Sequence, residues 1–296
     1  MNKRIITLLL FVIGLTAFAQ QNPVLPVDPE VRTGKLENGL TYYIRHNSLP
    51  ENRADFYIAQ RVGSMQEEDN QAGLAHFLEH MAFNGTTNFP GKSMLNYLQD
   101  NGIKFGTNIN AYTSFDETVY YLTNIPTTNA NLMDSALLVL YDWSSEIALE
   151  EEELENERGV IREEWRTRGG AQQRLWEQLL PKMYVDSKYA NRMPIGSIDV
   201  INNFKPEEIR EYYHKWYRPD LQGIIVVGDF DVDEMEQKVK SLFASIPLDT
   251  ERAEREYFPV PNNKDPIIAV ATDKEARNTS IMMFYKHDAI HKKKKN

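Results

Sequence analysis

The sequence contains no cysteine in its 296 residues, and this absence narrows the chemistry open to it. Disulfide bonds, thiolate nucleophiles and cysteine-ligated zinc are all excluded. A tight metal site would therefore need histidine and carboxylate ligands, a set that suits a catalytic zinc site better than a structural one. The absence of disulfides also leaves the chain indifferent to the redox state of its compartment.

Basic residues are in the minority, because 33 Lys and Arg face 43 Asp and Glu, for a net charge of −10. The body of the chain has no basic stripe. Binding to nucleic acid depends on clustered cations that neutralise phosphates, so nucleic acid is not an expected partner. The apolar fraction of 42% is ordinary for a globular protein and argues against general disorder.

Long apolar runs are also scarce. The longest covers residues 5–18 and is too short to span a bilayer comfortably. Lys3 and Arg4 precede it, and the Ala-Phe-Ala sequence at 17–19 fits the small-x-small rule for cleavage. This pattern predicts a signal peptide over residues 1–19, export to the periplasm or the medium, and no stable membrane anchor; an uncut anchor is the alternative.

The remaining pattern predicts an α+β fold, because strands and helices mix without a strict βαβ alternation. A hairpin is expected over 35–46, with a turn at Asn38-Gly39, and a polar loop over 63–70. Further strands are expected over 55–62, 108–113, 118–125 and 221–227. Helices are expected over 72–83, 92–101, 131–145, 150–168, 172–183, 206–217 and 232–243.

The domain prediction divides the mature chain into three parts. Residues 20–250 form one domain, and the charged, proline-containing stretch 251–265 reads as a linker. After it come only two strand candidates, 267–271 and 279–285. Because two strands do not make an independent domain, residues 266–296 are predicted to be the incomplete start of a second domain.

The segment most informative about function is the sequence His-Phe-Leu-Glu-His at residues 76–80. His76 and His80 are one helical turn apart on a helix that is otherwise apolar, so they share a face and suit one metal ion. Glu79 lies near the same face and is placed to accept a proton from water. A pair of core histidines is the alternative, but it leaves three ionisable groups on an apolar helix unexplained. The pattern matches the His-x-x-Glu-His signature of inverzincins, zinc peptidases whose motif is the reverse of His-Glu-x-x-His.

A catalytic zinc site needs a third protein ligand, and the acidic helix over 150–168 is the best source. Glu150, Glu157 and Glu164 are spaced by two helical turns and form one stripe. Glu163 is the neighbouring alternative, although its side chain would point about 100° away.

At this point the chain resembles the pitrilysin, insulinase and mitochondrial processing peptidase family of zinc endopeptidases. The resemblance covers roughly residues 30–250 and is strongest to large periplasmic bacterial members of the family. It is carried by the stretches 76–86, 110–114, 118–121, 157–164 and 226–230.

The resemblance implies a mostly antiparallel mixed sheet covered by helices, as in processing peptidases. It also implies one Zn²⁺ per chain, with His76, His80 and Glu164 as ligands and Glu79 as the base. Glu157 becomes an essential supporting residue, although Glu157 as the third ligand is an alternative. A peptide or unfolded substrate would add as a strand beside Asn110, Ala111 and Tyr112.

The family further implies a related domain or a separate subunit that closes a chamber around the substrate. The activity expected is zinc-dependent hydrolysis of peptides, and the alternative is a non-catalytic binding subunit or an incomplete enzyme. The remaining histidines are expected to be structural or, for His287 and His291, part of a frayed tail.

Overall fold

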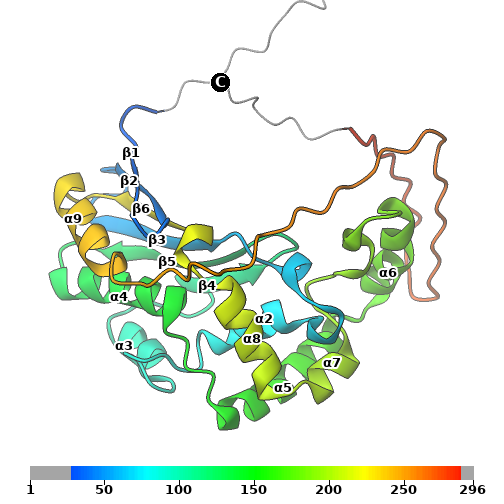
Figure 1. The fold of residues 1–296 in the computed structure, drawn as a ribbon, viewed down its shortest axis with the longest axis horizontal. Coiled ribbons are helices and arrows are strands. Elements are labelled where there is room, and N and C mark those ends of the chain that lie inside the picture. The colour runs from blue at the N-terminus through cyan, green and yellow to red at the C-terminus, as the bar shows by residue number, and fades with distance from the viewer. Residues whose placement is uncertain (1–27, 288–296) are drawn as a thin grey trace, which may run out of the picture. The chain divides into compact units, whose positions relative to one another are not determined.

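The computed structural model describes residues 28–287, whose regular structure is a six-stranded sheet with helices packed against it (Figure 1). The strands are β1 (Arg32–Lys35), β2 (Thr41–His46), β3 (Arg53–Gln60), β4 (Ile109–Thr113), β5 (Thr118–Pro126) and β6 (Gln222–Gly228). Their order in the sheet is β1-β2-β6-β3-β5-β4. Every pair is antiparallel except β2 and β6. The α+β prediction and the mostly antiparallel sheet are therefore confirmed.

The helices are α2 (Leu74–Met81), α3 (Ser93–Asp100), α4 (Ala130–Ser145), α5 (Glu151–Arg168), α6 (Ala171–Met183), α7 (Ile198–Asn203), α8 (Pro206–Trp216) and α9 (Val232–Phe243). Short 3₁₀ turns are η1 (Ser64–Gln66), η2 (Asp69–Gln71), η3 (Lys188–Asn191) and η4 (Pro219–Leu221). Most predicted helices and strands are present, with ends within two residues of the expected ranges. The exceptions are β1, which begins three residues before the expected hairpin, and α7, which was not predicted. No described helix is both long enough and apolar enough to cross a membrane.

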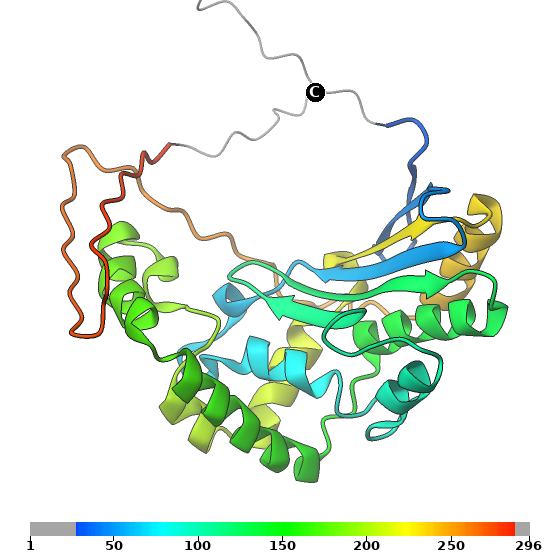
Figure 2. The same cartoon turned by 180° about the vertical axis from the view of Figure 1, so that it is seen from behind.

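The strands alternate between a buried face and a half-buried face, as the two-residue period of a strand requires. In β3 and β6 every second residue is buried. Figure 2 shows the helices on one side of the sheet, which is the side where the core lies. Helix α4 packs on β3 and β5, while α2 packs on β4, α5 and α8. The largest fully buried side chains include Trp143, Tyr120, Tyr212, Phe56 and Phe77.

Residues 63–70, predicted to be a polar loop, are in large part buried. The turns η1 and η2 lie here, and the side chains of residues 62–67 are all buried. Tyr212 on α8 donates a 2.9 Å hydrogen bond to the Gly63 carbonyl, and Lys188 donates one of 2.8 Å to the Glu67 carbonyl. The segment is therefore an internal support for α2, and its polar composition alone did not predict this.

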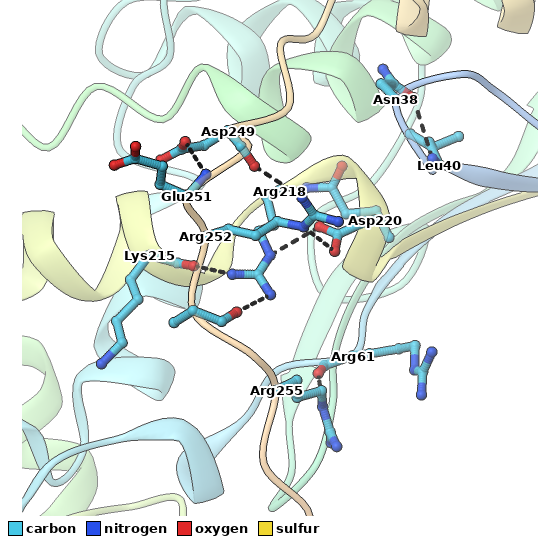
Figure 3. A network of polar contacts seen from close by, with 12 residues as sticks. Asn38, Leu40, Arg61, Lys215, Arg218, Asp220, Asp249, Glu251, Arg252 and Arg255 are labelled. Atoms are coloured by element: carbon cyan, nitrogen blue, oxygen red, sulfur yellow. Dashed lines mark hydrogen bonds and ion pairs between the residues drawn. The ribbon is translucent and has the colours of Figure 1, made fainter.

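The described chain after α9, residues 244–287, forms no helix or strand. Arg218 on the segment before β6 donates to the Ala253 carbonyl at 2.6 Å, and Arg252 binds Asp220 at 2.9 Å (Figure 3). Arg255 donates to the Arg61 carbonyl at 2.6 Å. These arginines hold the predicted linker against the body of the protein.

The two strands predicted over 267–271 and 279–285 are wrong for the described residues, which have no regular structure there. Their apolar side chains, such as Ile268 and Ile281, are largely exposed. A strand is stable only when its backbone groups pair with a neighbouring strand, and no described strand lies beside either segment. The predicted signal peptide, His291 and the end of the chain lie outside the described residues, and the division into domains stays a prediction.

Candidate metal centre

Helix α2 carries both histidines and Glu79 in the interior of the protein. Seven of its eight residues are buried, and His76 and Glu79 are only 6% and 9% exposed. The apolar members of the helix pack into the core, which fixes the direction of its polar face. The helix begins after Gly73, whose φ of 107° is a left-handed conformation that glycine adopts readily.

The first turn of α2 is capped by the side chain of a residue that lies outside the helix. Gly73 supplies no side-chain cap, but Oε1 of the buried Glu67 accepts a 2.9 Å hydrogen bond from the Ala75 N–H. This carboxyl group satisfies a helix N–H that would otherwise lack a partner. Glu67 was not predicted from the sequence, because it lies eight residues before its partner Ala75 and fits no helix-capping spacing.

Helix α5 brings its acidic stripe to the histidines. Leu154, Arg158 and Ile161 are its buried residues, and they hold one face of α5 against the rest of the protein. Arg158 donates to the carbonyls of Ile201 and Phe204 at the end of α7, at 2.5 and 2.6 Å. This anchoring places Glu157 and Glu164 beside α2.

Three metal-ligating side chains meet between α2 and α5. One nitrogen or carboxylate oxygen from each of His76, His80 and Glu164 lies within 4.8 Å of the other two, so this group of described residues could hold a metal ion. Oε2 of Glu164 is 3.6 Å from Nε2 of His76 and 3.3 Å from Nε2 of His80. Two ligands held about 2.05 Å from a tetrahedral zinc ion are about 3.4 Å apart. The donor types and the two distances from Glu164 to the imidazoles therefore fit zinc.

Glu157 lies behind His80 and contacts its other ring nitrogen. Nδ1 of His80 is 2.8 Å from Oε1 of Glu157. An ionised carboxylate only accepts hydrogen bonds, so the proton of the neutral imidazole belongs on Nδ1 and the lone pair of Nε2 faces the cluster. Glu157 is thus a hydrogen-bond partner of His80 on the side of the ring that faces away from His76 and Glu164.

The other acidic candidates are turned elsewhere. Glu163 is exposed and pairs with Arg166 at 2.5 Å. Glu150 is exposed at the start of α5 and takes no part in the cluster. Oε1 of Glu164, the oxygen that does not face the histidines, pairs with Arg168 at 2.5 Å.

The surroundings shift the pKa values of the two imidazoles in opposite directions. Burial lowers the pKa of His76, and the neighbouring His80 lowers it further. Burial also opposes the charge on His80, but hydrogen bonds with Glu157 and Glu164 outweigh it and raise the pKa of His80 to about 9. The hydrogen bond with His80 is the largest of the effects that lower the pKa of Glu164. The cluster thus stabilises positive charge between its two carboxylates.

Glu79 lies on the same helix with its carboxylate directed toward β4. Its Oε2 accepts a 2.7 Å hydrogen bond from the hydroxyl of Thr113, the last residue of β4. Burial raises the pKa of Glu79, and the Thr113 hydrogen bond opposes this rise. Thr113 lies in the stretch 110–114 that carries the family resemblance, but its contact with Glu79 was not predicted, since only the packing of β4 over α2 brings the two side chains together.

The predicted substrate-binding residues Asn110, Ala111 and Tyr112 lie on β4, at the end of the sheet order. Within the described chain β5 is the one strand that pairs with β4, so β4 is an edge strand. Its other edge is partly occupied, because Ile109 bridges Phe105 and the Ala111 N–H donates a 2.9 Å hydrogen bond to Oδ1 of Asn110. Tyr112 is 46% exposed and donates a 3.1 Å hydrogen bond to Glu117. This exposure sets it apart from Tyr120, which is fully buried in the core.

The fold and the cluster define a metallopeptidase-type α+β domain, and comparison with known proteins agrees. Residues 43–193 match the family described as Insulinase (Peptidase family M16), and residues 203–293 match the Peptidase M16 inactive domain. The chain belongs to the insulinase family, peptidase family M16.

Relatives from bacteria and plants support this assignment. The chain is 36% identical over 262 residues to the probable zinc protease PqqL of Escherichia coli, covering 88% of this chain and 28% of the relative. It is 36% identical over 254 residues to a zinc protease PQQL-like protein of Arabidopsis thaliana, covering 86% and 26%. The chain therefore spans about a quarter of these two relatives.

Solved structures show the same fold. The first half of the periplasmic protease PqqL from Escherichia coli superposes with a TM-score of 0.76 at 36% identity, covering 81% of this chain and 51% of that one. A protease from Helicobacter pylori superposes with a TM-score of 0.69 at 27% identity, covering 79% and 55%.

Proposed function

We propose that this chain carries the catalytic zinc centre of a metalloendopeptidase. His76, His80 and Glu164 are the ligands, and Glu79 is the general base. The observation that carries the proposal is the convergence of two imidazoles and one carboxylate from α2 and α5 on a single point, at separations that suit tetrahedral zinc. Relatives named as zinc proteases share the fold and support the same metal.

A zinc ion held by this group supplies Lewis-acid polarisation of water and of a peptide carbonyl. Glu79 removes the proton of the attacking water. Its Oε2 is held by Thr113, which leaves Oε1 as the atom to accept that proton. The raised pKa of the buried carboxyl makes Glu79 a stronger base than an exposed glutamate, and the protonated form can then donate to the leaving amine.

Glu157 has a supporting role in this proposal. By accepting from Nδ1 of His80, it places the single proton of the neutral ring on Nδ1, which leaves the lone pair of Nε2 for a metal ion, and it fixes the plane of the ring. The edge of β4 that faces away from β5 is the proposed substrate site, where a peptide segment pairs with the backbone of residues 110–112 and replaces the Asn110 side chain as the partner of the Ala111 N–H. Because Thr113 ends this strand and contacts Glu79, a peptide bound there passes close to the base.

We further propose that a second domain or a subunit covers this site and that the protein acts in the periplasm or outside the cell. The match of residues 203–293 to the inactive domain of the family, together with the greater length of the relatives, supports a second domain. The apolar run over 5–18 and the periplasmic description of the similar Escherichia coli protease support export.

The test compares the wild-type chain with Glu79→Gln. We expect both proteins to bind one zinc ion, measured by elemental analysis after removal of loosely bound metal. Only the wild type should cleave a pool of unfolded peptides, because glutamine cannot accept the proton. Zinc binding without cleavage by the wild type would favour the non-catalytic alternative, and equal cleavage by both would refute the role of Glu79.

A further inference from the structure

The Glu157 carboxylate has a second oxygen, and this oxygen is also held. Oε2 of Glu157 accepts a 2.6 Å hydrogen bond from Nδ2 of Asn84, which is 5% exposed and lies just beyond the end of α2. Lys92 donates from Nζ to Oδ1 of the same amide. A continuous chain of hydrogen bonds therefore runs from Lys92 through Asn84 and Glu157 to Nδ1 of His80.

In each of these hydrogen bonds, the chemistry of the two side chains decides which group donates and which accepts. An ammonium group only donates, so the amide of Asn84 must turn its carbonyl oxygen toward Lys92. The NH₂ group of Asn84 then faces Glu157, whose carboxylate only accepts. With both oxygens occupied, the carboxylate of Glu157 is fixed in plane and accepts the Nδ1 proton of His80.

The conformation of the loop between Asn84 and Lys92 brings these two residues together. Gly85 has a φ of 134°, and a Cβ on it would lie 3.0 Å from the backbone nitrogen of Gly91. Only glycine permits this close return of the chain. Asp142 on α4 holds the loop from inside, accepting from the hydroxyl of Thr86 and, at 2.6 Å, from Nδ2 of Asn88.

We infer that Asn84 is a positioning residue for the metal ligand His80 and that Lys92 acts through it by selecting the orientation of the Asn84 amide. The inference rests on the proposed function, since it concerns how tightly the same three ligands bind zinc. Partners behind a metal-ligating histidine commonly change metal affinity by 10–100-fold. Asn84 and Lys92 extend that support outward from Glu157 to the surface of the protein.

The first test is Asn84→Asp, which keeps the shape of the side chain and replaces the donor facing Glu157 with an acceptor. We expect zinc affinity, measured by competition with a chelating dye, to fall about tenfold. The opposite result is expected if Asn84 only fills space, because an added negative charge near a cation site strengthens cation binding. Unchanged or tighter zinc binding by Asn84→Asp would overturn the inference.

Asn88→Asp is the matched control. Asn88 lies in the same loop and also donates its amide to a buried carboxylate, that of Asp142, but it does not contact Glu157. We expect Asn88→Asp to lower the thermal stability of the metal-free protein with little effect on zinc affinity. Equal losses of zinc affinity in both variants would mean that loop integrity, and not the contact with Glu157, is responsible.

The role of Lys92 is tested by a double-mutant cycle. Lys92→Met should weaken zinc binding about threefold in the wild type, a smaller effect than that of a direct partner of Glu157. It should have no effect in an Asn84→Ala background, because Lys92 has no amide left to orient. Additive losses would contradict the relay. If the wild type binds no zinc at all, the proposed function fails, whereas wild-type binding with unaffected variants rejects only this inference.

Discussion

The hydroxyl of Thr113 donates a 2.7 Å hydrogen bond to Oε2 of Glu79, which joins the edge strand β4 to the histidine-bearing helix α2. This bond connects β4, the strand proposed to bind the substrate, directly to the proposed base Glu79. The bond also stabilises the ionised form of Glu79 against the effect of burial, which raises its pKa. Thr113 therefore influences both the position and the basicity of Glu79.

Replacing Thr113 with Val removes the hydroxyl at nearly constant volume. We expect the pKa of Glu79 to rise further, because its carboxylate loses a donor while remaining buried. The acid limb of the pH profile of kcat/KM should move to higher pH, and kcat/KM at neutral pH should fall about tenfold. Peptide cleavage across a pH series measures both effects.

Thr113→Ser is the control for this change, since it keeps the hydroxyl and should restore the wild-type pH profile. The zinc content of all three proteins should be equal, because Thr113 contacts no ligand. A Val variant whose pH profile superimposes on that of the wild type would show that the hydrogen bond does not act on Glu79.

The adjacent residues Glu163 and Glu164 give the sharpest test of the ligand set. Glu164→Ala removes the carboxylate that faces both imidazoles and should weaken zinc binding by more than about 100-fold, beyond the effect of losing an outer partner. Glu163→Ala removes an exposed carboxylate paired with Arg166 and should leave zinc affinity unchanged. Competition with a chelating dye measures both, and equal losses would remove Glu164 from the ligand set.

Much of this site could be predicted from helical periodicity, which relates residues that are close to one another in the sequence. The i, i+4 spacing of His76 and His80 and the two-turn spacing of Glu157 and Glu164 place each pair on one helix face. A sequence alone does not show that α2 and α5 pack with these faces together. That contact depends on tertiary packing, including the anchoring of Arg158 to the end of α7.

The parts that were missed or wrong depend on contacts between distant segments. Glu67 and Thr113 support Glu79 and its helix from a turn region and from a strand, and neither belongs to a spaced motif. The strands expected over 267–271 and 279–285 have suitable composition but no described partner strand. A high β-propensity means that a residue fits well into a sheet, but a strand forms only where a neighbouring strand is available to pair with it.

Arg158 provides a test of how α5 is held. Its buried guanidinium group donates to two carbonyls at the end of α7 and lies 3.8 Å from the centre of the Phe204 ring. Arg158→Met keeps an unbranched apolar side chain but leaves both carbonyls without this donor. We expect the free energy of unfolding of the metal-free protein to fall by about 2–3 kcal/mol, measured by urea denaturation.

The matched variant is Arg162→Met, which alters an exposed arginine one turn further along the same helix. Its free energy of unfolding should stay within about 0.5 kcal/mol of the wild type, as is usual for surface substitutions. Similar losses in the two variants would mean that arginine at any position of α5 matters, and the specific anchoring to α7 would have to be abandoned.

Glu67 predicts how stability depends on pH. Burial raises the pKa of this carboxyl group from its ordinary value of 4.5 to about 8, although backbone N–H groups at the start of α2 oppose the shift. Between these two pH values the unfolded chain has lost the proton and the folded chain retains it. Since the folded state then binds more protons, stability falls as pH rises through this window, by up to about 1.4 kcal/mol per pH unit from this group.

Glu67→Gln isolates this contribution, because glutamine retains an oxygen that can accept from Ala75 but does not ionise. Urea denaturation of the metal-free wild type and variant at several pH values between 5 and 8 should show the variant gaining stability relative to the wild type as pH rises. Glu68→Gln changes the exposed neighbouring carboxylate and should follow the wild type across the series. Parallel curves for the wild type and Glu67→Gln would mean that the Glu67 carboxyl ionises in the folded protein as readily as in the unfolded chain, and that donors at the start of α2 fully offset the effect of its burial.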